Sequence, residues 1–512
     1  MAGVPFDHGI GHLPRGESHA RCVDRLVVHG PPIDFATLAR RAIPSDTTHL
    51  VLDLDRTTHL GRNLGELLGW ELAGWHAYGD AHAAAHDHRH PLGRFWLDPR
   101  RPLAAAGYLL RAIRVWAHPG LRYLFHGRLA PRTLAGRRRR ARRYGAQPMR
   151  AIQRHPQTAL LSQIAALPPG VAATLARRVW DRHAPDQVIT RDDLDALRAR
   201  IPGLVIVLSS ASPRATVEAA AQALGVDDAL WSTVEDHAGR ATASYRQHRL
   251  DLQPRPERIG DPAAEIINAG VAKIERLRAR HPAMFAPGAR VVGISDTGHG
   301  EDHCWVEHFA RVIDVNAVDP YSPIVPAGAP IEEIHSAHLL TARERERHAA
   351  GDPEWLDPRR DPAVRAARHR VFDAAALDAA LGPHRDAIEA HAADLAAAHA
   401  AVAPALDALA ARHAALIAEI AATVRAHNAG DRRALARLRR QIRLEDALAA
   451  QAAAIGEPVA LARLEIETLR ADARRALDPS PRAISPPATA RRAPPAPAPP
   501  APAPSAHRGS TS

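Results

Sequence analysis

Three short apolar runs, each followed at once by polar residues, predict buried strands of a parallel sheet. They are residues 49–55 (HLVLDLD), residues 204–208 (LVIVL, before Ser209 and Ser210) and residues 290–294 (RVVGI, before Ser295 and Asp296). Short runs without polar alternation are typical of strands that are covered on both faces. Helical stretches separate them, so we expect an open α/β sheet whose site lies where the carboxyl ends of the strands meet.

The region 59–200 is far longer than a crossover between strands requires, and its pattern is almost entirely helical. We therefore predict a helical domain inserted into an α/β core that consists of residues 45–58 and 201–345. Residues 1–44 would be an N-terminal extension. Within the core, the turn His237-Ala238-Gly239-Arg240 predicts a β-hairpin, because β-compatible runs flank it.

Beyond about residue 350 the chain becomes rich in alanine. The stretch 351–362 (GDPEWLDPRRDP) indicates a linker, and a sevenfold spacing then follows at Ile388, Leu395, Val402, Leu409 and Leu416. This spacing predicts a coiled coil or helical hairpin over residues 360–478, kinked at Pro404, with turns at Gly430 and at residues 456–458. An alanine-rich bundle is favoured over a partner-binding stripe, and self-association through these helices stays open. The tail 479–512, rich in Pro, Ala and Ser, is predicted to be disordered.

The net charge does not distinguish between the possible classes of function. Sixty-seven Lys and Arg against 56 Asp and Glu give a net charge of +11, which suits anionic partners, although a generally basic surface explains it equally well. The cluster from Arg137 to Arg143 is interpreted as a solvated face, and nucleic-acid binding is not expected, because no pattern of stacking aromatic residues accompanies the cluster. The apolar stretch 103–125 contains three arginines and a histidine, so membrane association is not favoured.

Cysteine usage and the N-terminal residues bear on the compartment. Cys22 and Cys304 are far apart and belong to no zinc-binding pattern, which favours a reducing environment. The first residues show no basic segment followed by an apolar run, so no secretory signal is expected. We therefore expect a cytoplasmic protein.

The segment Asp53-Leu54-Asp55 places two carboxylates at the exit of a predicted strand. Phosphoryl transfer to a carboxylate requires a nucleophile in line with the leaving oxygen and a proton donor for that oxygen. The first acid can face phosphorus while the second approaches the leaving group. A divalent cation is also needed to screen the charges, and Mg²⁺ suits a site that offers oxygen ligands only.

Together with Thr57, these acids form a DxDxT pattern that resembles motif one of the haloacid dehalogenase (HAD) superfamily. The resemblance implies that Asp53 is the nucleophile, that Asp55 is the general acid and base, and that Thr57 steadies the loop and binds phosphate. The segment VIVLSSASPRATVEAAAQALGV resembles motif two of the phosphoserine-phosphatase-like branch. This implies that Ser210 binds a phosphoryl oxygen, with Ser209 as the second choice, and a helix-capping role is compatible with either.

Two further motifs follow in the order that the superfamily requires. Lys273, in GVAKIE at a predicted helix start, resembles the motif-three lysine, which contacts both nucleophile and phosphate. The stretch from Ser295 to Glu301 (SDTGHGE) resembles motif four and implies that Asp296 binds the metal. Its spacer has four residues where three are usual, so the supporting acid is Glu301 or Asp302. The implied metal set is Asp53, Asp55, Asp296 and Glu301.

The resemblance implies a Rossmann-like parallel sheet in which residues 59–200 form a helical cap that selects the substrate. It also implies a Mg²⁺-dependent phosphatase that hydrolyses a small phosphate monoester through an aspartyl phosphate on Asp53. The acid at Asp55 argues against the dehalogenase branch, while phosphoryl transfer to another acceptor stays open. The alternative is a non-catalytic interaction protein that keeps the HAD fold and binds partners through its helical C-terminus.

Overall fold

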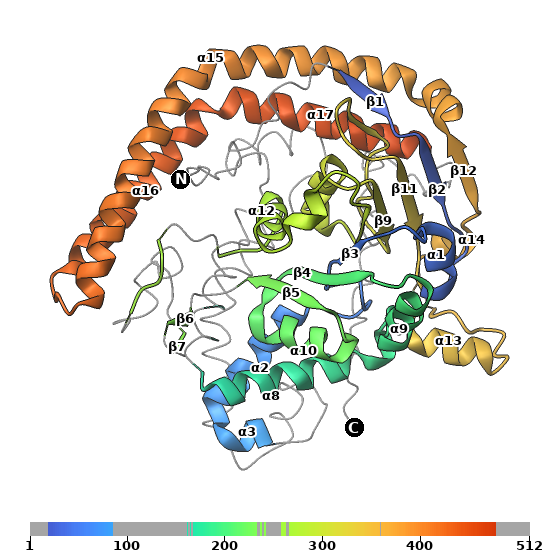
Figure 1. Cartoon of the computed structure of the whole chain (residues 1–512), viewed down its shortest axis with the longest axis horizontal. Helices are drawn as coiled ribbons and strands as arrows, with labels where there is room; N and C mark the ends of the chain where they lie inside the picture. Colours follow the sequence, from blue (N-terminus) through green and yellow to red (C-terminus); the bar gives the residue numbers. More distant parts are fainter. Residues whose placement is uncertain are drawn as a thin grey trace, which may run out of the picture.

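The computed structural model describes residues 19–84, 161, 164, 167–232, 236–237, 240–241, 258–262, 266–358 and 360–477. At its centre lies an eight-stranded sheet in the order β12-β2-β11-β9-β8-β3-β4-β5, with helices on both sides (Figure 1). The predicted α/β class is therefore confirmed. The stretch 103–125, the arginine cluster 137–143 and the tail 479–512 lie outside the described residues.

The three strands predicted from the apolar runs are neighbours in this sheet. β3 (His49–Leu52) pairs in parallel with β4 (Val205–Pro213) on one side and with β8 (Val291–Ser295) on the other. Leu52 is level with Leu208 and with Ile294. Because the strands are parallel and in register, the polar residues that follow them meet at one edge of the sheet.

The remaining strands complete the sheet and two small ribbons. In the sheet they are β5 (Asp228–Ser232), β9 (Arg311–Val315), β11 (Glu333–Ala337), β2 (Arg25–Val28) and the antiparallel edge strand β12 (Arg370–Asp373). β1 (Ala20–Cys22) pairs with β10 (Ile324–Pro326). β6 (Asp236–His237) pairs antiparallel with β7 (Arg240–Ala241), as the predicted hairpin requires.

Alternating side chains of the strands enter two hydrophobic cores. One core joins Leu50 and Leu52 of β3 to α1 (Phe35–Ala42), α9 (Arg191–Arg200) and α10 (Arg214–Leu224). The other joins Val51 to α12 (Val271–Arg280) and to two C-terminal helices. Residues 1–44 were predicted to be an extension, but their strand β2 belongs to the sheet and their helix α1 packs on it. Similarly, α9 lies within residues 59–200 but packs on the sheet.

The described part of the inserted region contains α2 (Leu64–Tyr78), α3 (Asp80–Ala84) and α8 (Pro169–Arg182). α2 and α8 share a small apolar core that includes Leu68, Leu72 and Leu175. Beside it lies a buried ion cluster in which Glu71 contacts His82 at 2.7 Å, Arg178 at 3.0 Å and Arg182. These contacts hold the pKa of Glu71 down at about 2 although burial by itself raises it.

The remaining short helices lie in the connections between these elements. They are α13 (Ala342–Ala349), α14 (Pro362–Ala366) and the 3₁₀ turns η2 (Ala184–Asp186), η3 (Pro282–Phe285), η4 (Gly298–Gly300) and η5 (His303–Glu307).

Three long helices form the C-terminal region. α15 (Ala374–Asn428) includes Pro383 and Pro404 and follows an arch over the sheet (Figure 1). α16 (Ala434–Ile455) returns along it, and α17 (Glu457–Ala476) continues back over the sheet. The chain turns between α15 and α16 at Gly430, as predicted, whereas only Gly456 separates α16 from α17, and residues 457 and 458 already belong to α17. Of the sevenfold-spaced residues, Ile388, Leu395, Leu409 and Leu416 are buried and Val402 is partly buried, so the spacing marks the side of α15 that packs inward.

By length and mean hydropathy, α15 is the one described helix that could cross a membrane. This is weak support for a span, because an alanine-rich helix that packs against other helices has the same composition. Its contacts with α16 and α17 are among the most extensive between described elements.

The Glu71 cluster leads to a prediction about stability. Glu71→Gln is expected to lower the free energy of unfolding by about 3 kcal/mol, because it removes the carboxylate that faces two buried guanidinium groups. Urea unfolding followed by circular dichroism measures the loss. Glu66→Gln is the matched control on the same helix, since Glu66 pairs with Arg62 at the surface, and it should cost less than about 1 kcal/mol. Equal losses in the two variants would contradict the prediction.

Candidate active site

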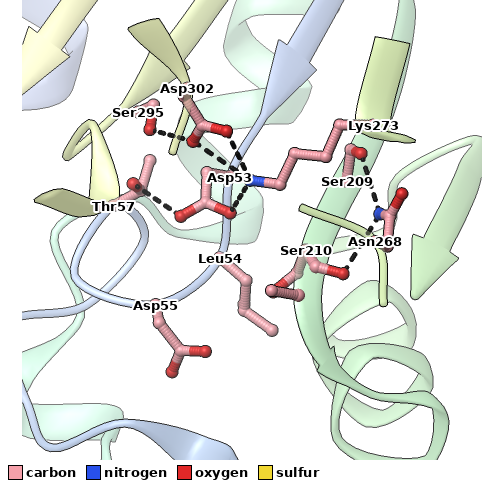
Figure 2. A network of polar contacts seen from close by, with 12 residues as sticks. Asp53, Leu54, Asp55, Thr57, Ser209, Ser210, Asn268, Lys273, Ser295 and Asp302 are labelled. Carbon is pink, nitrogen blue, oxygen red and sulfur yellow. Dashed lines mark hydrogen bonds and ion pairs between the residues drawn. The ribbon is translucent and has the colours of Figure 1, made fainter. Parts of the chain in front are cut away.

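Asp53 and Lys273 form the centre of a polar network at the carboxyl edge of the sheet. Asp53 directly follows β3, and its backbone N–H donates to the carbonyl of Ile294 in the neighbouring strand at 2.9 Å. Lys273 Nζ lies 2.8 Å from Asp53 Oδ1 and 3.0 Å from Asp302 Oδ2 (Figure 2). The structure thus brings together two residues that are 220 positions apart in the chain.

The fold fixes the position of the Lys273 side chain. α12 begins after Gly270, whose φ of 59° favours glycine, and Lys273 lies in its first turn. The side chain is 2% exposed, and its ammonium group lies 5.4 Å from the ring centre of Trp305. Burial alone would lower the pKa of Lys273, but the carboxylates of Asp302 and Asp53 outweigh burial and raise it. The ammonium group therefore stays charged.

Asp302 is the acid after β8 that joins this network. It is 1% exposed and accepts a hydrogen bond from Ser295 Oγ at 2.5 Å in addition to its contacts with Lys273. Glu301 is half-buried and lies beside Gly298 in the η4 turn. Of the two acids that the sequence offered, the structure thus places Asp302 against Lys273. The tight turn Thr297–Gly300, with positive φ at Thr297, Gly298 and Gly300, determines which of the two acids points inward.

Thr57 connects the loop after β3 to the loop after β8. Its Oγ1 accepts from the Asp296 backbone N–H at 2.8 Å and lies 3.5 Å from Asp53 Oδ2. Asp296 follows β8 directly, and its Oδ1 accepts from the Gly298 N–H at 3.0 Å. Thr57 therefore holds the two acids that follow neighbouring strands in a fixed relation.

The pKa values of these acids indicate an excess of buried negative charge. Burial raises the pKa of Asp53 to about 6, with Asp302 and Asp55 adding to the rise and Lys273 opposing it. Burial, followed by the charges of Asp53 and Asp302, raises the pKa of Asp296 to about 8. Three buried carboxylates thus share one buried ammonium group.

This charge balance fits a divalent cation, which would restore ionisation of Asp53 and Asp296. No set of three or more His, Cys, Asp and Glu side chains is arranged as a metal site among the described residues. Two carboxylates completed by water and substrate are what Mg²⁺ commonly uses, so the donor set suits this ion.

A family model for haloacid dehalogenase-like hydrolases matches residues 115–299 of the chain. The match includes Ser210, Lys273 and Asp296, whereas Asp53 lies before it and Asp302 lies after it.

The chain carries a haloacid dehalogenase-like hydrolase domain.

The comparison with solved structures includes a protein of unknown function from Bordetella pertussis Tohama I. It is 18% identical, and the alignment covers 53% of this chain and 91% of that one with a TM-score of 0.31. No curated protein matches the chain.

In this HAD domain the side chain of Asp55 points away from the network around Asp53 (Figure 2). Its Oδ2 accepts from Ser212 Oγ at 2.5 Å, and its Oδ1 accepts from the Leu64 N–H at the start of α2 at 2.7 Å. Burial by itself raises the pKa of Asp55, but contacts with His59, Ser212 and Leu64 lower it overall. The structure therefore does not bring the Asp55 carboxylate to Asp53 and Asp296, with which it was predicted to bind the metal.

Ser209 and Ser210 lie in the part of β4 where its pairing with β5 becomes irregular. The pairing of β4 with β5 shifts register between Ser209 and Pro213. Ser210 Oγ accepts from the Ser212 N–H at 3.1 Å, so its hydroxyl hydrogen can be donated to a phosphoryl oxygen. Ser209 Oγ instead accepts from Asn268 Nδ2 at 3.1 Å (Figure 2).

Asn268 is a residue of the site that the sequence interpretation missed. It is fully buried, and its amide also donates to the Ser210 carbonyl at 3.1 Å, which fixes the serine segment relative to the segment that precedes α12. The available signal was a lone polar residue in the apolar stretch IINAGV, five positions before Lys273. A buried amide of this kind is usually held for its hydrogen bonds.

The raised pKa of Asp296 predicts how the stability of the metal-free HAD domain depends on pH. The folded state binds this proton more tightly than the unfolded state, so the free energy of unfolding falls as pH rises from 3.8 to about 8. Asp296→Asn removes the penalty, and it should stabilise the chelator-treated protein at pH 8 by more than about 1 kcal/mol.

Asp55→Asn is the matched control, because the pKa of Asp55 is lowered and its charge stabilises the fold. This variant should be destabilised at pH 8. Thermal and urea unfolding in the presence of EDTA give both values. A destabilised Asp296→Asn variant would refute the charge balance described above.

Proposed function

We propose that the HAD domain is a Mg²⁺-dependent phosphatase that hydrolyses a small phosphate monoester through an aspartyl phosphate on Asp53. The observation that supports this most strongly is the contact of Lys273 Nζ with Asp53 Oδ1 at 2.8 Å beside Asp296. An ammonium group in this position favours the ionised form of the nucleophile and attracts an anionic substrate to it.

Asp53 and Asp296 would hold Mg²⁺, which supplies positive charge to the equatorial phosphoryl oxygens. Lys273 provides a second cation on the same side, and Asp302 with Ser295 keeps its ammonium group in place. Ser210 would donate its hydroxyl to a phosphoryl oxygen. Asp53 then attacks phosphorus, the P–O bond to the leaving alcohol breaks, and the phosphoryl group becomes bound to the Asp53 carboxylate.

Asp55, which the free site keeps ionised, would take up the proton of a phosphate monoanion and pass it to the departing oxygen in the first step. In the second step it would remove a proton from water, whose oxygen attacks phosphorus and breaks the bond to Asp53, so that inorganic phosphate is released. In-line transfer places the leaving oxygen on the far side of phosphorus from the nucleophile. An acid that is separated from Asp53, as Asp55 is in Figure 2, is compatible with this requirement. The separated carboxylate is a better candidate for proton transfer than for metal binding.

The proposal predicts Mg²⁺-dependent release of p-nitrophenol from p-nitrophenyl phosphate. Asp53→Asn should reduce kcat by about 10⁴-fold or more, because no other described residue occupies the position of the nucleophile. Glu346→Gln, an exposed acid on α13, should retain full activity.

A second candidate function is an interaction protein in which the arch of α15, α16 and α17 binds a partner. Its support is the size of this region, which extends beyond the sheet (Figure 1). Purified wild-type protein that is inert with Mg²⁺ across a broad panel of phosphate esters would refute the phosphatase and favour this alternative.

A further inference from the structure

Two buried histidines lie beside Asp55 and have no part in the mechanism above. His59 is fully buried and His183 is 4% exposed, and their rings stack with centres 4.4 Å apart and planes 24° apart. Within the part of the chain that the structure describes, neither ring nitrogen of His59 makes a hydrogen bond, and Nε2 lies 3.5 Å from Asp55 Oδ1. Burying unpaired ring nitrogens is unfavourable, and a phenylalanine would fill the same space without this cost.

The surroundings fix the His59 ring tightly. Trp180 meets it edge-on at 6.3 Å, and His183 covers one of its faces. Gly61 leaves room for His183, since a Cβ at this position would lie 1.9 Å from His183 Nδ1. Burial lowers the pKa of His183 to about 4, with the neighbouring His59 as the next cause, so this supporting ring is neutral near pH 7.

The pair also lies where the chain enters and leaves the inserted region. His59 follows the loop after β3 and forms a β-bridge with Gln187, while His183 directly follows α8. Two backbone hydrogen bonds of 2.9 Å join the same two segments: the Leu60 N–H donates to the Asp186 carbonyl, and the Val188 N–H donates to the Thr58 carbonyl. The two segments that connect the inserted region to the core therefore both hold the histidine stack, and this fixes its position relative to Asp55.

We propose that His59 is a positioning residue for Asp55, with its ring held in place by His183. The inference rests on the proposed phosphatase function. Asp55 Oδ2 accepts from Ser212 Oγ at the end of β4, its Oδ1 accepts from the Leu64 N–H at the start of α2, and His59 Nε2 lies 3.5 Å from the same Oδ1. A carboxylate held from three directions keeps one orientation, and proton transfer to the leaving oxygen depends on that orientation.

The test compares two substrates of similar shape that differ in how strongly their cleavage depends on protonation of the leaving oxygen. Phenyl phosphate has a poor leaving group that requires protonation, whereas p-nitrophenyl phosphate has a good one. The ratio of their kcat/KM values reports the first chemical step, because kcat/KM excludes the later hydrolysis of the phosphoryl-enzyme. A residue that only stabilises the fold would affect both substrates equally.

Two substitutions at His59 separate the ring from the donor. His59→Phe keeps the stack and loses the donor, so we expect kcat/KM for phenyl phosphate to fall at least about tenfold more than for p-nitrophenyl phosphate. His59→Gln loses the ring but can place its amide donor near the Nε2 position, and should keep the substrate ratio within about threefold of wild type. His183→Phe is the matched control and should also keep the ratio, because it preserves the stack and does not contact Asp55.

Ser212→Ala provides an independent variant if His59→Phe fails to fold. It removes another donor to the same carboxylate without touching the stack, and it should show the same selective loss on phenyl phosphate. Equal losses on both substrates in His59→Phe would overturn the role of His59. If that variant fails to fold, equal losses in Ser212→Ala would overturn it. So would a His59→Gln variant with the same selective loss as His59→Phe. A wild-type protein inactive on both esters would instead overturn the phosphatase proposal, and with it this inference.

Discussion

The burial of three carboxylates around one ammonium group is the constraint on which the site depends. Asp53, Asp296 and Asp302 are each less than 9% exposed, and Lys273 is the cation that contacts two of them. Such an arrangement costs stability unless further positive charge arrives. The raised pKa values of Asp53 and Asp296 express this cost. A site of this kind is suited to bind a cation together with an anionic substrate, and is less stable when empty.

The parallel sheet imposes this constraint through its register. Leu208 of β4, Leu52 of β3 and Ile294 of β8 lie level with one another, so the polar residues that follow them share one edge. α12 then brings Lys273 to that edge, and Trp305 together with Asp302 encloses its side chain. Asn268 and Thr57 link segments that come from different strands. Much of the packing around the site therefore serves to hold like charges close together.

Much of the core was predictable because its signals are local. Apolar runs that end in Asp53, in Ser209 and Ser210, and in Asp296 define the strands and the edge at which they meet. The choice between Glu301 and Asp302 was not predictable, because it depends on the positive φ values in the turn from Thr297 to Gly300. The orientation of Asp55 and the contacts of Asn268 depend on partners that are distant in sequence, and a single sequence does not show such pairs.

The C-terminal helices were predicted from the sevenfold spacing of apolar residues, but their position over the sheet was not. Ile388 and Leu395 on α15 pack in the same core as Val51 of β3, and β12 joins the sheet beside β2. The C-terminal region thus begins as part of the core that carries the site and extends away from it as the arch of α15, α16 and α17 (Figure 1). A partner that bound the arch would therefore be attached to the domain that carries the site.

The proposed mechanism depends on phosphorylation of Asp53. The most direct measurement is the mass of acid-quenched Asp55→Asn protein after mixing with Mg²⁺ and p-nitrophenyl phosphate. This variant lacks the base for the second step, whereas the first step proceeds because p-nitrophenolate leaves without being protonated. We expect a phosphoryl adduct that maps to the peptide containing Asp53 and is absent after a further Asp53→Asn substitution. An adduct on another residue, or continued turnover in the variant that also carries Asp53→Asn, would contradict it.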